Sequence, residues 1–193
     1  MRAGVVAAAC VAAVGIAAGA SWEASSPPAD PPTPVAPAPG VVSRQLTDEA
    51  EAGLRAVWSR WGWRGWLKAG PRSSDWAPLW HTVHLAMAAE GVAAATGRES
   101  DIARVRRLLR LAEGYWNPDL GGYAGKYETR GRAASWFDDN GWLGLAFLEA
   151  YRITRVRRYL NYADAAFQFI AQTGWADGAG GGVWWDTRHT SRS

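Results

Sequence analysis

The sequence predicts an all-helical protein built from stacked helical hairpins. Three observations lead to this expectation. Apolar residues recur with helical periodicity from residue 46 onward, amphipathic helices alternate with helices that are apolar on nearly every side, and short connections alternate with long ones. Because a helix that is apolar all round must be enclosed, we expect buried inner helices, each flanked by amphipathic outer helices.

Five helices are expected, in order, at residues 47–60, 79–95, 100–114, 137–152 and 156–173. Thr47 and Ser100 are the expected N-caps of the first and third, because a hydroxyl oxygen can accept a hydrogen bond from the N–H groups of the first turn. The second and fourth helices are the apolar ones. Only residues 182–185 have a strand-like pattern.

An internal repeat supports the hairpin arrangement. The segment GYWNPDLGGY at 114–123 is similar to GWADGAGGGVW at 174–184, and each follows an outer helix. The offset from Trp116 to Trp175 is 59 residues, and that from Leu79 to Trp136 is 57. A period near 58 that contains two helices indicates stacked hairpins. Closed into a ring, they would place every long connection on one rim, at the N-termini of the inner helices.

Tryptophan is concentrated on that predicted rim. The chain has 13 tryptophans, and ten of them lie in or beside the long connections. The C–H faces of a sugar ring stack on indole rings, while its hydroxyls need nearby polar groups. The sequence therefore predicts a carbohydrate-binding rim.

The N-terminal part of the chain has a different character. Residues 3–20 are uncharged and rich in alanine, follow Met1-Arg2 and end in Ala-Gly-Ala, so residues 1–20 are expected to be a signal peptide of a secreted protein. An uncleaved membrane anchor is the alternative. The segment 21–43 is expected to be a proline-rich linker, and 44–193 the globular part.

Composition excludes several classes of function. The net charge of +3 is too small to indicate a nucleic-acid partner or, after signal cleavage, a membrane. The single cysteine, Cys10, excludes a disulfide scaffold and a cysteine-based zinc site. His81 and His84 have a spacing that can bind a metal ion, but no third ligand is evident, so no metal and no other cofactor is expected.

Asp138 and Asp139 form an acidic pair in the first turn of the fourth helix. One interpretation is that they complement the helix macrodipole. The other is catalytic, because adjacent carboxylates repel and raise the pKa of one of them. The result is one proton donor and one anion, which retaining glycoside cleavage requires. Aromatic and amide side chains flank the pair: Trp136, Phe137, Asn140 and Trp142.

The stretch WFDDNGWLGLAFLEAYRITRVRRYLNYADAAFQFI (136–170), with YWNPDLGGY before it and GWADGAGGGVWWDTRHT after it, resembles glycoside hydrolase family 76. The resemblance covers about residues 46–190. It implies an (α/α)6 barrel and endo-acting hydrolysis of α-1,6-linked mannan with retained configuration, or transfer to another sugar. It also implies that Asp138 is the nucleophile and Asp139 the acid/base. The side chains expected to contact substrate are Trp116, Tyr123, Trp136, Phe137, Asn140, Trp142, Trp175, Trp184 and Trp185.

The length departs from that family. Six hairpins of this period need roughly 350 residues, whereas about 150 follow the linker. We therefore expect an N-terminal part of the catalytic domain with about five helices. Two alternatives remain open at this point: an inactive remnant that binds mannan, and another helical-ring sugar enzyme, such as an epimerase or an unsaturated uronyl hydrolase.

Overall fold

A computed structural model describes residues 43–193, except 129, 132, 178–180, 190, 192 and 193. The predicted signal peptide and all but the last residue of the predicted linker lie outside the described residues. In the part of the chain that is described, no helix is both long and apolar enough to span a membrane.

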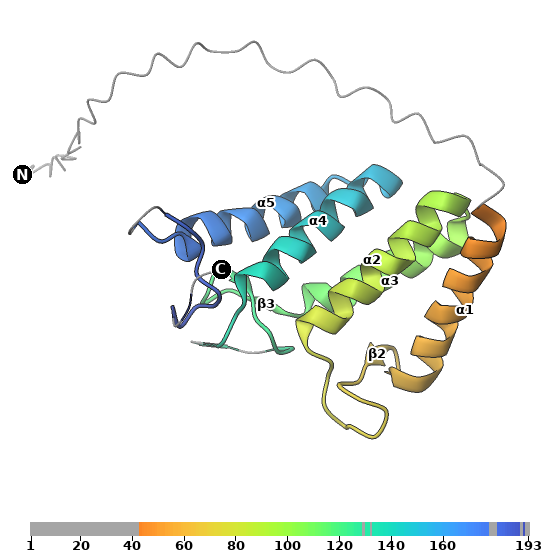
Figure 1. The fold of residues 1–193 in the computed structure, drawn as a ribbon, viewed down its shortest axis with the longest axis horizontal. Helices are drawn as coiled ribbons and strands as arrows, with labels where there is room; N and C mark the ends of the chain where they lie inside the picture. The colour runs from red at the N-terminus through yellow and green to blue at the C-terminus, as the bar shows by residue number, and fades with distance from the viewer. Residues whose placement is uncertain (1–42, 129, 132, 178–180, 190, 192–193) are drawn as a thin grey trace, which may run out of the picture. The chain divides into compact units, whose positions relative to one another are not determined.

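The described chain is mainly helical, as predicted (Figure 1). The elements are α1 (Ser43–Trp61), β1 (Gly62–Trp63), β2 (Trp66–Leu67), α2 (Leu79–Thr96), α3 (Glu99–Glu113), β3 (Trp116–Asn117), β4 (Gly122–Tyr123), α4 (Phe137–Thr154), α5 (Arg158–Phe169) and the π-helical turn η1 (Ile170–Gly174). All five expected helices are present. The two expected N-caps are wrong, because Thr47 lies within α1 and Arg98 is the N-cap of α3.

Two short antiparallel ladders, β1–β2 and β3–β4, were not predicted. Each strand has only two residues, which is too short to show an alternating pattern. Their turns do leave a signal in the sequence. Arg64 and Gly65 both have positive φ, which the tight β1–β2 turn needs, and Gly121 has φ 69° at the end of the β3–β4 turn.

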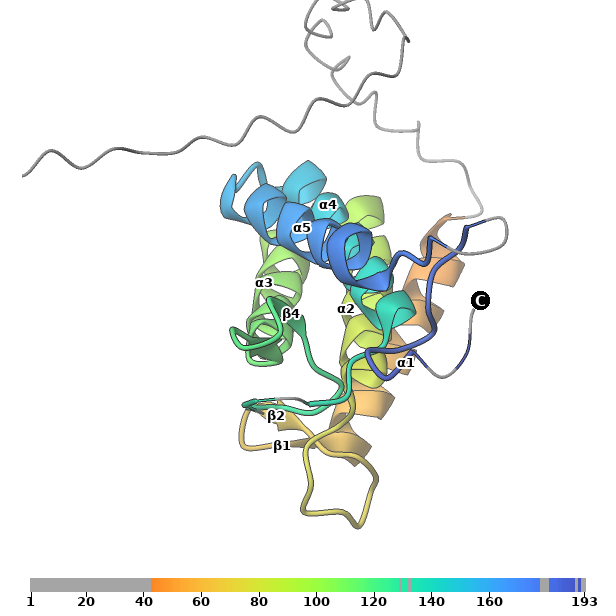
Figure 2. The ribbon, with the colours of Figure 1, turned by 90° about the vertical axis from the view of Figure 1, so that its left-hand side faces the viewer.

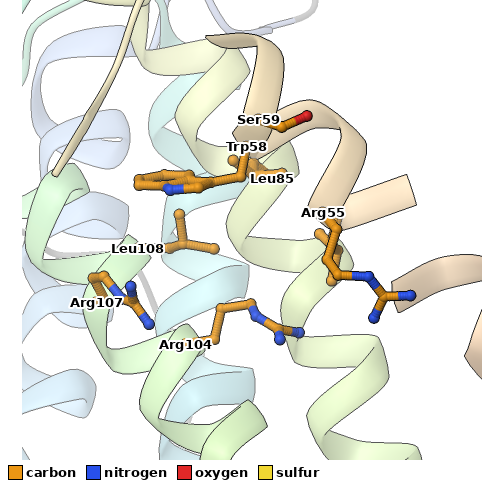
Figure 3. A pocket seen from close by; sticks show the side chains of 8 residues that line it. Arg55, Trp58, Ser59, Leu85, Arg104, Arg107 and Leu108 are labelled. Atoms are coloured by element: carbon orange, nitrogen blue, oxygen red, sulfur yellow. The ribbon is translucent and has the colours of Figure 1, made fainter. Parts of the chain in front are cut away.

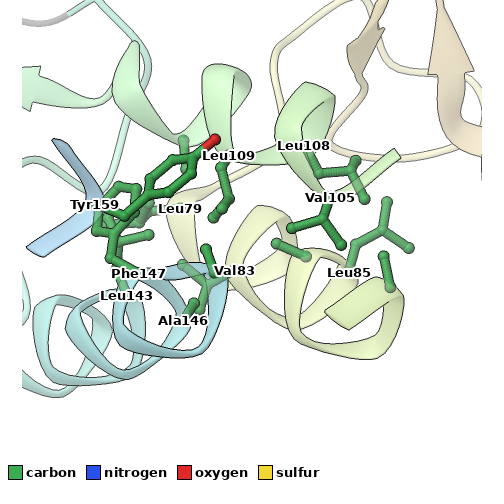
Figure 4. Close-up of a cluster of buried hydrophobic side chains, with 14 of the residues drawn as sticks. Leu79, Val83, Leu85, Val105, Leu108, Leu109, Leu143, Ala146, Phe147 and Tyr159 are labelled. Atoms are coloured by element: carbon green, nitrogen blue, oxygen red, sulfur yellow. The ribbon is translucent and has the colours of Figure 1, made fainter. Parts of the chain in front are cut away.

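The helices α2 and α4 are the inner ones. They contact each other, α2 also contacts α1 and α3, and α4 contacts α3 and α5. Figure 4 shows the core that joins them. Its largest fully buried aliphatic and phenylalanine side chains come from α2, α3 and α4: Leu79, Val83, Val105, Leu109, Leu143 and Phe147. One face of the inner helices stays open among the described residues, where Trp80, Trp142, Leu145 and Leu148 are 36–47% exposed.

The internal repeat is confirmed by matching features of α2 and α4. Phe137 begins α4 58 residues after Leu79 begins α2. Both helices end on a left-handed residue, Gly97 and Arg155, again 58 residues apart. Each of these residues donates its backbone N–H to the carbonyl four residues earlier. The two hairpins are therefore built on one plan.

The long connections gather at the N-terminal ends of α2 and α4, as predicted, while the short connections α2–α3 and α4–α5 lie at the opposite end (Figures 1 and 2). Backbone hydrogen bonds fix this arrangement. The N–H of Leu79 donates to the carbonyl of Gly125 at 3.1 Å, and the N–H of Phe137 donates to that of Trp185 at 3.2 Å. The first turns of both inner helices thus open onto one rim.

Candidate active site

The first turn of α4 is held in place by a buried amide. Asn140 is fully buried, and its Oδ1 accepts a hydrogen bond from the backbone N–H of Tyr123 at 2.9 Å. Its Nδ2 lies 2.9 Å from the carbonyl oxygens of Tyr123 and Trp136 and donates to them. Ser135 Oγ donates to the same Tyr123 carbonyl at 2.6 Å. The β3–β4 ladder is thereby fastened to the start of α4.

Phe137 fastens the same turn from the other side. Its side chain is 2% exposed and packs on Phe169, with ring centres 5.2 Å apart. Trp136 precedes it with extended backbone, forms an isolated bridge with Asp186, and carries the Arg188 guanidinium 5.9 Å from its ring centre. The residues before and after the acidic pair therefore serve to position it.

The two carboxyl groups differ in their surroundings. Asp139 is 8% exposed, and burial raises its pKa to about 7, with a further contribution from the charge of Asp138. The Oδ1 atom of Asp138 is buried and has no hydrogen-bond partner among the described residues. The sequence predicted a raised pKa from repulsion alone, whereas the structure gives burial as the larger cause. The pair thus combines a carboxyl group that keeps its proton up to about pH 7 with a buried carboxyl oxygen that has no hydrogen-bond partner among the described residues.

This geometry argues against the macrodipole interpretation. An acid that caps a helix accepts hydrogen bonds from the first N–H groups, which lowers its pKa. For Asp139, burial and the charge of Asp138 raise the pKa instead. A buried carboxyl group with a raised pKa costs folding free energy. Such a group in the first turn of a helix is typical of a functional site.

Exposed aromatic rings lie beside the pair. Trp142 follows Asp138 by one helical turn and is 41% exposed, and its ring centre is 6.1 Å from that of His84 on α2. The His84 ring lies 3.9 Å from that of Trp80, which is also 41% exposed. We call Trp80, His84 and Trp142 the aromatic strip. Trp185, 43% exposed, adjoins the pair through the hydrogen bond of its carbonyl to Phe137.

The sequence-based site list missed Trp80 and His84. The repeat could have revealed them, because Trp80 lies 58 residues before Asp138, and His84 lies 58 residues before Trp142. The Nδ1 atom of His84 lies 2.8 Å from the backbone carbonyl oxygen of Trp80, within hydrogen-bond distance. Within the described residues, no three His, Cys, Asp or Glu side chains are grouped to hold a metal ion.

Three of the predicted substrate contacts are buried. Tyr123, Phe137 and Asn140 are at most 2% exposed, so a ligand cannot reach their side chains in this structure. Phe137 and Asn140 adjoin the pair in sequence, and Tyr123 ends the segment YWNPDLGGY. In the structure, all three pack or form hydrogen bonds around the start of α4.

The other predicted contacts are distributed along the rim. Trp175 is 56% exposed and forms an isolated bridge with Val183, and Trp184 stacks on His189 at 5.1 Å. Trp116 packs edge-on against the ring of Tyr123 at 5.2 Å.

The fold and the site together define a class: a protein of helical hairpins around an inner layer, with a paired-acid site on an aromatic rim. Residues 71–193 match the model of glycosyl hydrolase family 76. This chain belongs to that family. No curated protein sequence matches the chain.

Solved structures share the fold. The family 76 α-mannanase of Bacteroides thetaiotaomicron superimposes with a TM-score of 0.63 at 22% identity, over 77% of this chain and 43% of that one. The α-1,6-mannanase of a Salegentibacter species gives 0.55 at 25% identity, over 73% and 38%. A D-mannose isomerase gives 0.62 at 14% identity, over 78% and 43%. The described helices thus form part of an (α/α) barrel, and the chain spans about two fifths of these structures.

Proposed function

We propose that this chain is part of an endo-acting hydrolase of α-1,6-linked mannan that retains the anomeric configuration. The observation that carries the proposal is the unequal pair: Asp139, whose pKa burial raises to about 7, and Asp138, with a carboxyl oxygen that has no hydrogen-bond partner among the described residues. Retaining cleavage needs one carboxyl group of each kind.

In the first step, the Asp138 carboxylate attacks the anomeric carbon while Asp139 donates its proton to the departing glycosidic oxygen. The C–O bond to the leaving chain breaks, and a glycosyl ester with Asp138 forms. In the second step, Asp139, now ionised, takes a proton from water, and the water oxygen displaces Asp138. The pKa of about 7 suits both roles, because Asp139 must give and regain a proton near neutral pH.

The relatives support the substrate class. The Salegentibacter α-1,6-mannanase has a solved structure as an inactive variant, in which two consecutive aspartates are replaced by asparagine, in complex with α-1,6-mannotriose. This chain has consecutive aspartates in the first turn of α4, and exposed indole rings of Trp142 and Trp185 beside them. Stacking of mannose rings on these indoles would place the scissile bond at the pair.

The test measures release of reducing ends from linear α-1,6-mannan by the chain and by three variants. Asp138→Asn and Asp139→Asn should each lower turnover by on the order of a thousandfold or more, while Asp164→Asn, an exposed aspartate on α5, should leave it unchanged. Azide should rescue the Asp138 variant with formation of the inverted glycosyl azide. Activity near the starting level in both pair variants would refute the mechanism.

Two alternatives have specific support. The open face of α2 and α4 favours a remnant that binds mannan without cleaving it, and binding with no turnover by the unmodified chain would select it. The fold is shared with D-mannose isomerase at 14% identity, so an enzyme that isomerises a sugar is the second alternative. Product analysis decides this case, because isomerisation or epimerisation changes the sugar without breaking a glycosidic bond.

We further propose that the protein is exported and that residues 1–20 are removed, on the basis of the short basic start, the apolar run and the Ala-Gly-Ala sequence before Ser21. N-terminal sequencing of the product of a secreting host should find a start at or near Ser21. An intact Met1 on membrane-bound protein would establish the anchor instead.

A further inference from the structure

A cavity of about 310 Å³ lies between α1, α2 and α3, away from the acidic pair (Figure 3). Its apolar floor consists of Leu54, Leu85 and Leu108, each at most 8% exposed. The indole of Trp58 lies against this floor. The volume is at the lower end of those of small-molecule sites. None of the lining residues belongs to the acidic pair or to the aromatic strip.

Three arginines line the same cavity. Arg55 extends from α1, and Arg104 and Arg107 extend from α3 (Figure 3). The Arg104 side chain is 29% exposed, whereas Arg55 and Arg107 are exposed at the mouth of the cavity, above the core leucines at its base. Positive charge and apolar surface are thus combined in one place.

The surrounding carboxylates do not neutralise this charge. Glu51 pairs with Arg55 at 3.4 Å, and also with Arg98. Asp101 pairs with Arg98 at 2.7 Å and with Arg104 at 3.2 Å. The carboxylates of Glu51 and Asp101 are therefore shared among Arg55, Arg98 and Arg104. In the described part of the chain, Arg107 has no carboxylate partner at all.

Arg104 has unused donor capacity. Its Nη1 atom is buried and makes no hydrogen bond to any described residue, although it lies within ion-pair distance of Asp101. Burial opposes the ionisation of Asp101, but hydrogen bonds from Arg98 and Thr96 outweigh it and lower the pKa of Asp101. Both hydrogen bonds reach Oδ2 of Asp101. Its Oδ1 therefore remains as the ion-pair partner of Arg104 at 3.2 Å, without a hydrogen bond between the two groups.

We propose that this cavity binds an amphiphilic anion, in which a carboxylate or phosphate group is carried on an apolar chain or ring. The anionic group would accept hydrogen bonds from Arg104 and Arg107, because guanidinium groups bind such anions through paired donors. The apolar body would cover Leu85 and Leu108 and lie against Trp58.

Both parts of the ligand are needed for binding. An inorganic anion would leave the leucine floor in contact with water, and an uncharged amphiphile would leave the Arg107 guanidinium without an anionic partner. The site therefore discriminates against both. Since its residues lie on α1, α2 and α3 and the acidic pair lies on α4, occupancy should not compete with mannan.

The test is titration calorimetry of the full chain with octyl phosphate and octanoate below their micellar concentrations. Inorganic phosphate and octyl glucoside are the controls for charge alone and chain alone. We expect saturable binding of the two anionic amphiphiles, at least tenfold tighter than either control. The double variant Arg104→Gln/Arg107→Gln and the variant Trp58→Ala should each weaken binding at least tenfold. The matched variant Arg110→Gln, on α3 outside the cavity, should not weaken it.

Flotation with vesicles tests whether the anion is a lipid headgroup. Binding to phosphatidylglycerol vesicles but not to phosphatidylcholine vesicles, lost in the double arginine variant, would assign the site to a lipid. Binding of the soluble amphiphiles alone would assign it to a free ligand. Equal binding of octyl glucoside, or binding that either the double arginine variant or Trp58→Ala leaves unchanged, would overturn the proposal. Circular dichroism of each variant shows whether a loss of binding reflects unfolding.

Discussion

Asp139 is expected to destabilise the folded protein at neutral pH, and its replacement by asparagine to remove that cost. Its pKa rises from an ordinary 3.8 to about 7, first because it is buried and second because of Asp138. Below about pH 3.5 the carboxyl group is neutral in both the folded and the unfolded chain and favours neither. Between pH 3.8 and 7 the unfolded chain loses this proton and the folded chain keeps it, so stability falls as pH rises.

The magnitude follows from the size of the shift. About three pKa units, at 1.36 kcal/mol each, make the full cost about 4 kcal/mol above pH 7. Asp139→Asn should therefore raise the free energy of unfolding by up to about 4 kcal/mol at pH 7.5 and by close to nothing at pH 3.5. The same variant should lose turnover, as expected where an active site stores an unfavourable charge.

Urea unfolding at five pH values between 3.5 and 8 measures this difference directly. The control is Asp164→Asn, because this aspartate on α5 is exposed. Asp138→Asn supplies a second check, since removing its charge should lower the pKa of Asp139 and shift the fall in stability to lower pH. A difference between wild type and Asp139→Asn that is the same at all pH values, or a variant that is less stable at pH 7.5, would refute the reasoning.

Three further predictions concern the scaffold. Glu90 on α2 is 3% exposed, and burial, with a smaller contribution from the charge of Glu149, raises its pKa to about 8. Glu90→Gln should therefore stabilise the protein by up to about 3 kcal/mol at pH 7 and not at pH 4. A difference in stability that is the same at both pH values would contradict this. Asn140→Ala should cost on the order of 3 kcal/mol in urea unfolding, because it leaves buried backbone groups without partners; a cost below about 0.5 kcal/mol would contradict its positioning role. Gly122→Ala should lower the melting temperature, because a Cβ atom there would lie 2.5 Å from the Phe169 ring, whereas Gly53→Ala, with open space around it, should not.

The sequence predicted those parts of the fold that depend on local periodicity. The apolar stretches at 79–95 and 137–152 could be identified as inner helices because a helix without a polar face must be enclosed. The ladders β1–β2 and β3–β4 escaped prediction because two residues carry no period. The partners of Asn140 escaped it too, since they include the backbone of Tyr123, 17 positions earlier. A long-range contact of that kind leaves no local pattern.

The site was predicted in part for the same reason. Asp138 and Asp139 are adjacent in sequence and stand at a predicted helix start, so their proximity needed no tertiary information. Which neighbours are exposed could not be predicted, because exposure depends on the orientation of each side chain in the folded chain. Trp142 faces the open side of α4, whereas Phe137 in the same helix turns into the core.

The repeat also relates the exposed aromatic side chains of α2 to the acidic pair of α4. The helices α2 and α4 begin at equivalent positions of the repeat, end on equivalent left-handed residues and open onto the same rim. At the positions where α4 carries Asp138 and Asp139, α2 carries Trp80 and His81. The first turn of α2 therefore presents an exposed indole, while that of α4 presents the carboxyl groups. Because the two helices contact each other, the indole and the acids stay in fixed relation. The hairpin thus determines where a side chain stands on the rim, and the residue type at that place determines whether it binds or reacts.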